Sequence, residues 1–203
     1  MRVAAVLGWH VLDSGALYRL AALTVINHQI APDQIGVASK LARSMQIQFD
    51  QGLIRLDGKD VTSRIRDEDV GNLASELAKA PQLREALLER QRAFRMPVGL
   101  VADGRDMGTV VFPDAPLKIY LQAAVQARAM RRFQQLADKG GDVSYERVLE
   151  DLMARDDRDI NRAAAPLRPA VDAHIIDSSN LTIEQTVSAV LDLWAATACA
   201  GTS

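Results

Sequence analysis

The sequence predicts a parallel α/β fold, and three observations lead to this prediction. Short apolar runs typical of buried strands alternate with segments of helical length along the 203 residues. Apolar residues make up 48% and charged residues 25%, as in an ordinary globular protein. One apolar run, residues 98–102, ends at Asp103, with Arg105 and Asp106 directly after it. Ligands of open α/β sheets bind beyond the carboxyl ends of strands, so this stretch predicts a site.

The charge balance and the cysteine usage exclude several classes of protein. With 24 Lys and Arg against 26 Asp and Glu, the formal net charge is −2, so we expect neither a nucleic-acid nor a membrane partner. The lone Cys199 has no partner for a disulfide, which fits a cytoplasmic location. No run approaches the roughly 20 apolar residues of a membrane span, and the first residues lack the apolar core of a signal peptide.

The first 44 residues predict helices on both sides of a short strand. Residues 1–7 are apolar and alanine-rich, like the end of a helix, and Gly8 follows as its C-cap. Residues 9–12 predict a strand and residues 16–27 a helix that Asp13, Ser14 and Gly15 open. A further helix is expected from Pro32 to about Ser44.

The next segment predicts a small inserted subdomain. Residues 45–49 and 53–56 flank Gln51-Gly52 as a hairpin, a turn at Asp57-Gly58 follows, and residues 61–65 are expected to be extended. Two helices, residues 67–80 and 81–95, complete the subdomain, and a proline begins the second.

The last third returns to the strand and helix alternation. We expect strands at residues 116–121 and 174–177, and helices at residues 125–137, 144–155 and 182–196. Lys139-Gly140-Gly141 is expected to end the helix at residues 125–137 and to separate it from the next one. The helix from residue 144 runs on into residues 156–162, and residues 163–169, with two prolines, predict a loop.

The charged residues after the strand at 98–102 allow two interpretations. A carboxylate at a strand end, such as Asp103, can hold Mg²⁺ through water. Arg105 beside it can bind a phosphate with two hydrogen bonds. The alternative is a polar turn with a local ion pair.

Two further sets of residues suggest phosphate chemistry. Arg155, Arg158 and Arg162 are spaced i, i+3 and i+7, so on a helix they would share one face. They could close over phosphates, or form a solvated face that Asp156, Asp157 and Asp159 neutralise.

Ser14 and Arg19 lie near the start of an expected helix. A phosphate there would meet the backbone N–H groups of the helix, the serine hydroxyl and an arginine. The alternative role for Ser14 is that of a simple N-cap.

Three sequence blocks resemble the bacterial cytidylate kinases. They are LDSGALYR at residues 12–19, LVADGRDMGTVVFP at 100–113 and RDDRDINRAAAPL at 155–167, and the resemblance extends over residues 3–195. It implies the three-layer P-loop nucleoside-monophosphate kinase fold around a parallel sheet. The implied core covers residues 1–30, 96–140 and 170–197, the monophosphate-binding insert residues 31–95, and the lid residues 141–169.

The resemblance also implies an activity and its small-molecule partners. A monomer of this family transfers the γ-phosphoryl group of ATP to CMP or dCMP, with Mg²⁺, in pyrimidine metabolism. The residues implied to hold the CMP phosphate are Ser14, Arg19 and Arg105, with Arg162 as a further arginine on that side. Those implied to read cytosine are Ser75, Arg84 and Asp106, and those near the ribose are Arg155 and Asp159.

The implied catalytic residues are arginines. Arg158 would face the transferring phosphoryl group, where charge accumulates in the transition state, and Arg105 and Arg155 would act with it. Asp103 would support Mg²⁺, and the carboxylate of Asp106 would accept from the cytosine amine and so select against uracil.

One departure from the family pattern concerns the ATP side of the site. The family begins with a strand that leads into a G-x-x-x-x-G-K-[ST] loop, whose amides, lysine and hydroxyl bind the ATP phosphates and Mg²⁺. The printed sequence contains no such motif. We therefore expect a chain that lacks the first central strand and the P-loop, and impaired activity for the chain as printed. The alternative is a non-catalytic CMP-binding module or an inactive truncated remnant.

Overall fold

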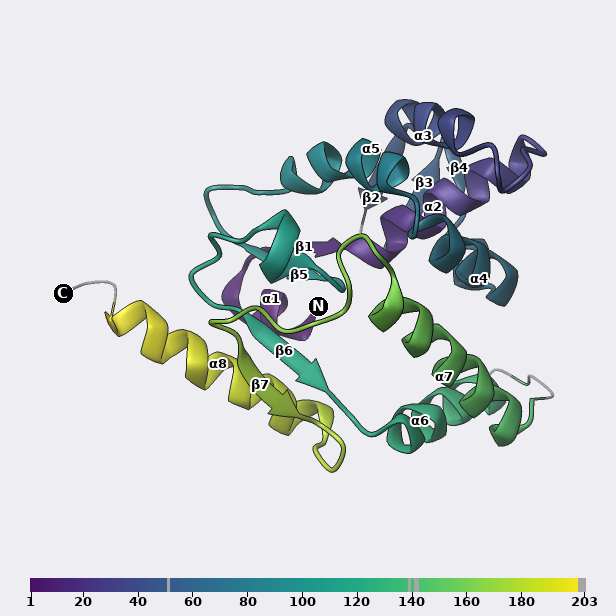
Figure 1. Cartoon of the computed structure of the whole chain (residues 1–203). Helices are drawn as coiled ribbons and strands as arrows, with labels where there is room; N and C mark the ends of the chain where they lie inside the picture. Colours follow the sequence, from purple (N-terminus) through teal and green to yellow (C-terminus); the bar gives the residue numbers. More distant parts are fainter. Residues whose placement is uncertain (51, 139, 141–142, 201–203) are drawn as a thin grey trace. The chain divides into compact units, whose positions relative to one another are not determined.

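The structure, a computed structural model, describes residues 1–50, 52–138, 140 and 143–200 (Figure 1). The chain forms two compact units. Unit 1 consists of Met1–Leu7, Arg105–Asn161 and Ala165–Ser203, and unit 2 of Gly8–Gly104 and Arg162–Ala164.

Unit 2 combines a parallel strand pair, helices and a small antiparallel sheet. Strands β1 (His10–Asp13) and β5 (Leu100–Asp103) pair in parallel, with His10 opposite Leu100 and Asp13 opposite Asp103. Its helices are α2 (Ser14–Asn27), α3 (Ile35–Ser44), α4 (Glu68–Leu77) and α5 (Pro81–Arg92).

Helix α2 is the centre of the unit 2 core. It packs on α3 and α4, while α3 also packs on α5. Leu17, Leu20, Leu23 and Val25 are almost fully buried. Because α2 is apolar on nearly all sides, it has no solvent-facing stripe, as expected for a helix enclosed by others.

The predicted hairpin is confirmed, but the prediction that residues 61–65 are extended is wrong. Strands β2 (Ile47–Asp50), β3 (Leu53–Leu56) and β4 (Lys59–Asp60) form an antiparallel meander. Gln51, at the predicted turn, lies outside the described residues, whereas Gly52 has a φ of +88°. The chain leaves the sheet after β4 because Asp60 Oδ1 accepts from the Thr62 amide at 2.9 Å, and residues Arg64–Arg66 form a 3₁₀ turn (η1) instead of a strand.

Unit 1 contains a second parallel strand pair and four helices among its described residues. Strands β6 (Ile119–Gln122) and β7 (His174–Asp177) lie side by side in Figure 1 and pair in parallel. The helices are α1 (Arg2–Leu7), α6 (Val125–Ala137), α7 (Tyr145–Asn161) and α8 (Ile183–Ala200). Helix α6 packs on α7 and α1 on α8, and a single π-helical turn (η2, Met107–Val111) follows Asp106.

The predicted mixed α/β fold with parallel strands is confirmed, and most element boundaries differ by only a few residues. Gly8 has a φ of +70°, which confirms the C-cap after α1. Of the predicted break at Lys139-Gly140-Gly141, only Gly140 lies within the described residues, with a φ of +76°. In the described ranges, no helix is long and apolar enough to span a membrane.

Candidate functional site

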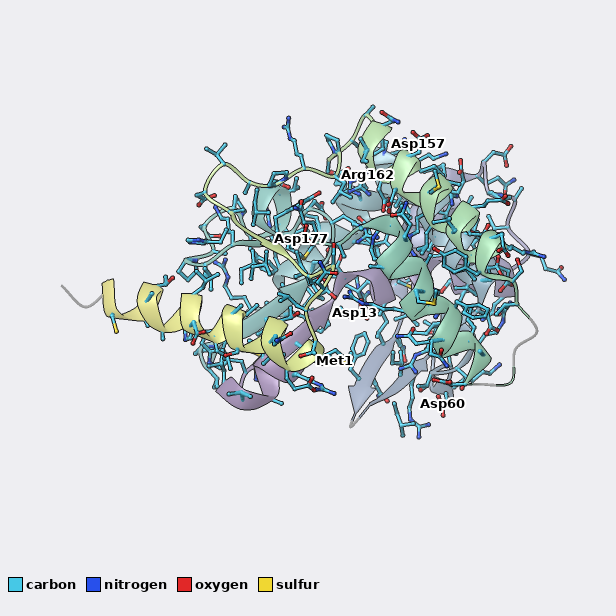
Figure 2. All side chains as sticks on the ribbon, turned by 90° about the horizontal axis from the view of Figure 1, so that it is seen from below. Met1, Asp13, Asp60, Asp157, Arg162 and Asp177 are labelled. Carbon is cyan, nitrogen blue, oxygen red and sulfur yellow. The ribbon has the colours of Figure 1, made fainter. Side chains whose placement is uncertain are left out.

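Two carboxylates end the parallel strands of unit 2 next to each other. Asp13 and Asp103 are register partners at the carboxyl ends of β1 and β5. Asp13 Oδ1 accepts from the Ala16 amide at 3.0 Å, so Asp13, at the junction of β1 and α2 (Figure 2), is the N-cap of α2. The alternative role of Ser14 as the N-cap is therefore wrong. Asp103 is exposed, and no described residue donates a hydrogen bond to its carboxylate.

Ser14 is the first residue of α2, and its side chain points into the protein. It is 3% exposed, and its Oγ donates to Gln91 Oε1 at 2.8 Å. Gln91 was not among the residues predicted from the sequence. The available signal was its spacing, because Leu83, Leu87 and Gln91 are four residues apart and lie on the buried face of α5.

Backbone carbonyl groups hold Arg19 at the start of α4. Its Nη1 donates to the Ile65 carbonyl at 2.8 Å and lies 3.4 Å from the Asp67 carbonyl oxygen. The guanidinium also lies against Gly71, where a Cβ atom would come within 2.9 Å of Nη2. These contacts fix the position of a cation close to the N-terminal end of α4.

The two residues predicted to read a base in unit 2 have distinct surroundings. Arg84 Cζ lies 5.8 Å from the ring centroid of Tyr18, within the range of a cation–π contact. Ser75 is buried on α4, and its Oγ has no hydrogen-bond partner among the described residues. A buried hydroxyl without a partner costs about 1–3 kcal/mol, and a polar ligand atom could relieve that cost.

In unit 1 the structure joins two residues that the sequence predicted for substrate binding. Arg105 Nε donates to Asp159 Oδ2 at 2.8 Å. Asp159 is 6% exposed, and its backbone carbonyl accepts from the Leu167 amide at 2.8 Å. The Arg105–Asp159 ion pair therefore spans 54 residues and links the β5–η2 connection to α7. It is not the local turn pair that the alternative interpretation expected.

Asp106 is the buried acid of the same segment. It is 5% exposed and immediately precedes η2. Its backbone carbonyl accepts from the amides of Val110 at 2.9 Å and Val111 at 3.2 Å, and these hydrogen bonds fix the backbone of Asp106. A carboxylate held in a buried position can select a ligand by hydrogen-bond direction, since it only accepts when ionised.

The helix face that Arg155, Arg158 and Arg162 were expected to share is only partly formed. Arg155 and Arg158 lie on α7, but that helix ends at Asn161, so Arg162 does not continue its face. Arg162 is instead buried and groups with unit 2, and it follows α7 directly in the chain (Figure 2). The prediction of three arginines on one helix is therefore wrong for Arg162.

The acids between these arginines have other partners. Asp156 pairs with Arg128 on α6, with Arg128 Nη1 3.0 Å from Asp156 Oδ1, and this carboxylate raises the pKa of Arg128. Asp157 accepts from Asn161 Nδ2 at 2.7 Å. Because Asp159 pairs with Arg105, each of the three acids has a partner outside the arginine set of α7.

Asp103 fits the one metal role that the sequence suggests. No group of three or more His, Cys, Asp or Glu among the described residues could form a closed metal site. Mg²⁺, however, usually keeps several waters and uses one or two carboxylates together with substrate phosphates. The exposed carboxylate of Asp103 at a strand end has the chemistry that such binding needs.

Comparisons with known proteins identify the family. The cytidylate kinase family model matches residues 1–196. A cytidylate kinase of Bordetella bronchiseptica is 58% identical over 196 residues, which are 96% of this chain and 87% of the relative. Those of Burkholderia pseudomallei and Aeromonas salmonicida are 57% and 52% identical over 189 residues, covering 93% and 91% of this chain and 83% and 82% of theirs.

These matches extend over nearly the whole chain and include both strand-end segments and the arginine-rich end of α7. The protein is a nucleoside-monophosphate kinase by class. Within that class, the chain belongs to the cytidylate kinase family.

Proposed function

We propose that the chain binds CMP or dCMP and that its activity is the transfer of the ATP γ-phosphoryl group to this acceptor, giving CDP or dCDP. The observation that carries the proposal is the cytidylate kinase match along residues 1–196, which includes every acceptor-site residue predicted from the sequence. The proposed CMP-binding residues are Ser14, Arg19, Ser75, Arg84, Arg105, Asp106, Arg155, Asp159 and Arg162.

The proposed recognition of cytosine depends on a buried acceptor. The carboxylate of Asp106 would accept from the exocyclic amine of cytosine, whereas uracil offers a carbonyl at that position. In unit 2, two features support the base-binding role proposed for Ser75 and Arg84: the Ser75 hydroxyl lacks a partner among the described residues, and Arg84 Cζ lies 5.8 Å from the centroid of the Tyr18 ring. Correctly placed polar groups of this kind reject the wrong ligand because they would be left unpaired.

The proposed catalysis is electrostatic. Phosphoryl transfer needs little covalent help from the protein, so positioning and neutralisation of charge dominate. Arg105, Arg155 and Arg158 would supply positive charge to the transferring group. Arg105 uses only its Nε for Asp159 in the structure, so its Nη groups can donate to phosphate oxygens while this ion pair is kept.

Asp103 would hold Mg²⁺ through water molecules at the end of β5. The bound ion would supply positive charge that offsets the charge of the ATP phosphates. The protein's own contribution at this point is the position of the carboxylate, which the parallel pairing of β1 and β5 fixes at the strand end.

The residues that would bind the ATP phosphates differ from the family pattern. The printed sequence contains no G-x-x-x-x-G-K-[ST] motif, and the lysine and amides of that motif bind the ATP phosphates. We propose that phosphoryl transfer is impaired in the chain as printed while CMP binding is kept. This observation also favours the second candidate function, a CMP-binding module without catalysis.

We further propose that the protein acts as a monomer on small molecules in the cytoplasm, without nucleic-acid or membrane partners. The formal net charge of −2 supports the absence of a polyanion-binding surface.

Equilibrium binding and product analysis together test these proposals. The purified chain is titrated calorimetrically with CMP, dCMP, UMP and AMP, and CDP formation from ATP, Mg²⁺ and CMP is followed by chromatography. Preferential binding of CMP or dCMP supports the acceptor site, and CDP formation then distinguishes the enzyme from the binding module. Equal or absent binding of all four monophosphates would overturn the proposal.

A further inference from the structure

Gln91 is a buried amide in an otherwise apolar position. It is 2% exposed and lies on the face of α5 that also buries Leu83, Ala86 and Leu87. Packing alone would favour an apolar side chain there, because a buried amide costs free energy unless its polar atoms are hydrogen-bonded. The presence of an amide at this position therefore calls for a polar partner.

Ser14 is that partner, and the two residues come from different helices. Ser14 Oγ on α2 and Gln91 Oε1 on α5 lie 2.8 Å apart, although the residues are 77 positions apart in sequence. Gln91 Nε2 lies 3.3 Å from the Leu87 carbonyl oxygen, one turn earlier on its own helix. Both side chains are buried, so this contact is shielded from competition by water.

The neighbours of the amide fix the direction of the hydrogen bond. The Leu87 carbonyl can only accept, so the NH₂ group of Gln91 faces it and Oε1 faces Ser14. Ser14 must therefore donate its single proton to Gln91. The amide thereby fixes both the side-chain rotamer of Ser14 and the direction of its O–H bond.

We propose that Gln91 is a positioning residue of the monophosphate site and acts through Ser14. This inference rests on the proposed role of Ser14 in binding the CMP phosphate. Phosphate oxygens accept hydrogen bonds, so Ser14 must redirect its proton from Gln91 to the phosphate when CMP binds. With its proton directed to the phosphate, Ser14 Oγ can only accept a hydrogen bond from Gln91. Gln91 therefore stays bonded to it only if the amide turns over and presents Nε2, which gives up the contact with the Leu87 carbonyl. The amide would thus hold the hydroxyl oxygen in place through Oε1 before CMP binds and through Nε2 afterwards.

A double-mutant cycle tests whether Gln91 acts through Ser14. CMP and cytidine affinities are measured calorimetrically for the full chain and for Gln91→Met, Ser14→Ala and the double variant. Gln91→Met keeps the volume and removes the amide, and Gln82→Met, at an exposed position of the same helix, is the matched control. Loss of a hydrogen bond to a charged phosphate predicts about 10- to 100-fold weaker CMP binding for Ser14→Ala. For Gln91→Met we expect about 3- to 10-fold weaker CMP binding and unchanged cytidine binding.

The effect of Gln91→Met in the Ser14→Ala background shows whether Gln91 acts through Ser14. In the Ser14→Ala background, Gln91→Met should no longer change CMP affinity, because its effect passes through the missing hydroxyl. An equal effect in both backgrounds, or a Ser14→Ala variant that binds CMP normally, overturns the positioning role. The proposed function fails separately, and only if the unmodified chain shows no preference for CMP.

A measurement on the unmodified chain covers the case in which Gln91→Met does not fold. The side-chain NH₂ resonances of Gln91 are followed by NMR during titration with CMP and with cytidine. We expect CMP to shift them and cytidine, which lacks the phosphate, to leave them unchanged. Resonances that stay in place with saturating CMP overturn the proposal.

Discussion

Arg105 and Asp159 form an ion pair in which one partner is far more buried than the other. The Nε to Oδ2 distance is 2.8 Å, and the side-chain exposures are 44% for Arg105 and 8% for Asp159. Arg105 keeps access to water, whereas the carboxylate of Asp159 has little, so the ion pair replaces part of its hydration. The two residues are therefore not equivalent in what their removal costs.

Arg105→Gln should destabilise the fold more than Asp159→Asn. The first substitution removes a cation from beside a buried carboxylate and should cost about 1–3 kcal/mol, whereas the second removes the buried charge itself and leaves a partly solvated arginine, which should cost less. Urea denaturation of both variants measures the difference. An equal loss, or a larger one for Asp159→Asn, would show that burial does not govern this pair.

Asp106→Ala should remove the preference for cytosine. Without the buried acceptor for the exocyclic amine, discrimination between CMP and UMP should fall by about 1–3 kcal/mol. Calorimetric titration with both monophosphates measures the change, and Asp33→Ala, at an exposed position, is the control for general loss of charge. An unchanged ratio of the two affinities would exclude Asp106 from base recognition.

The chain as printed should form CDP at a rate far below the roughly 1–100 s⁻¹ typical of kinases. The physical reason is that the printed sequence contains no G-x-x-x-x-G-K-[ST] motif, whose lysine and amides bind the ATP phosphates. The comparison is a chimaera in which the strand and G-x-x-x-x-G-K-[ST] loop of a cytidylate kinase precede Met1. Turnover by the printed chain that matched the chimaera would mean that another element binds the ATP phosphates.

In an active chimaera, Arg158→Ala should lower kcat by orders of magnitude and change CMP affinity little. Its proposed contact is to the transferring phosphoryl group and forms mainly in the transition state, so its loss affects kcat. Arg147→Ala, an exposed arginine on the same helix, should leave kcat unchanged. A variant that loses CMP affinity and keeps kcat would place Arg158 in ground-state binding.

The lid assignment makes a prediction about backbone dynamics. Amides within residues 143–169 should gain protection from hydrogen exchange when the chimaera binds CMP and an ATP analogue, because a closed segment excludes water. Mass spectrometry of peptic fragments, with the α2 fragment as an internal reference, measures the change. Equal protection with and without ligands would argue against a moving lid.

The helices and strands were largely predictable from the sequence because their signals are local. Apolar periodicity and turn residues placed α2, the β2–β3 hairpin and α5 within a few residues of their observed bounds. The same local information placed charged residues at the end of β5. The family resemblance, carried by three short blocks, agrees with the match along residues 1–196.

Two predictions were wrong because a local pattern did not extend as far as expected. Residues 61–65 looked extended, but the Asp60 side chain turns the chain into η1. Arg162 had helical spacing from Arg155, but α7 ends one residue before it. Residues with helical spacing share a face only as far as the helix extends, and the spacing does not show where the helix ends.

The α/β fold, the family and the types of residue available for a nucleotide were all predictable from the amino-acid sequence. Tertiary structure decided which partners they have. Arg105 meets Asp159 across 54 residues and Ser14 meets Gln91 across 77. Such pairs depend on the packing of whole elements, and no periodicity in the chain records which side chains that packing brings within hydrogen-bond distance.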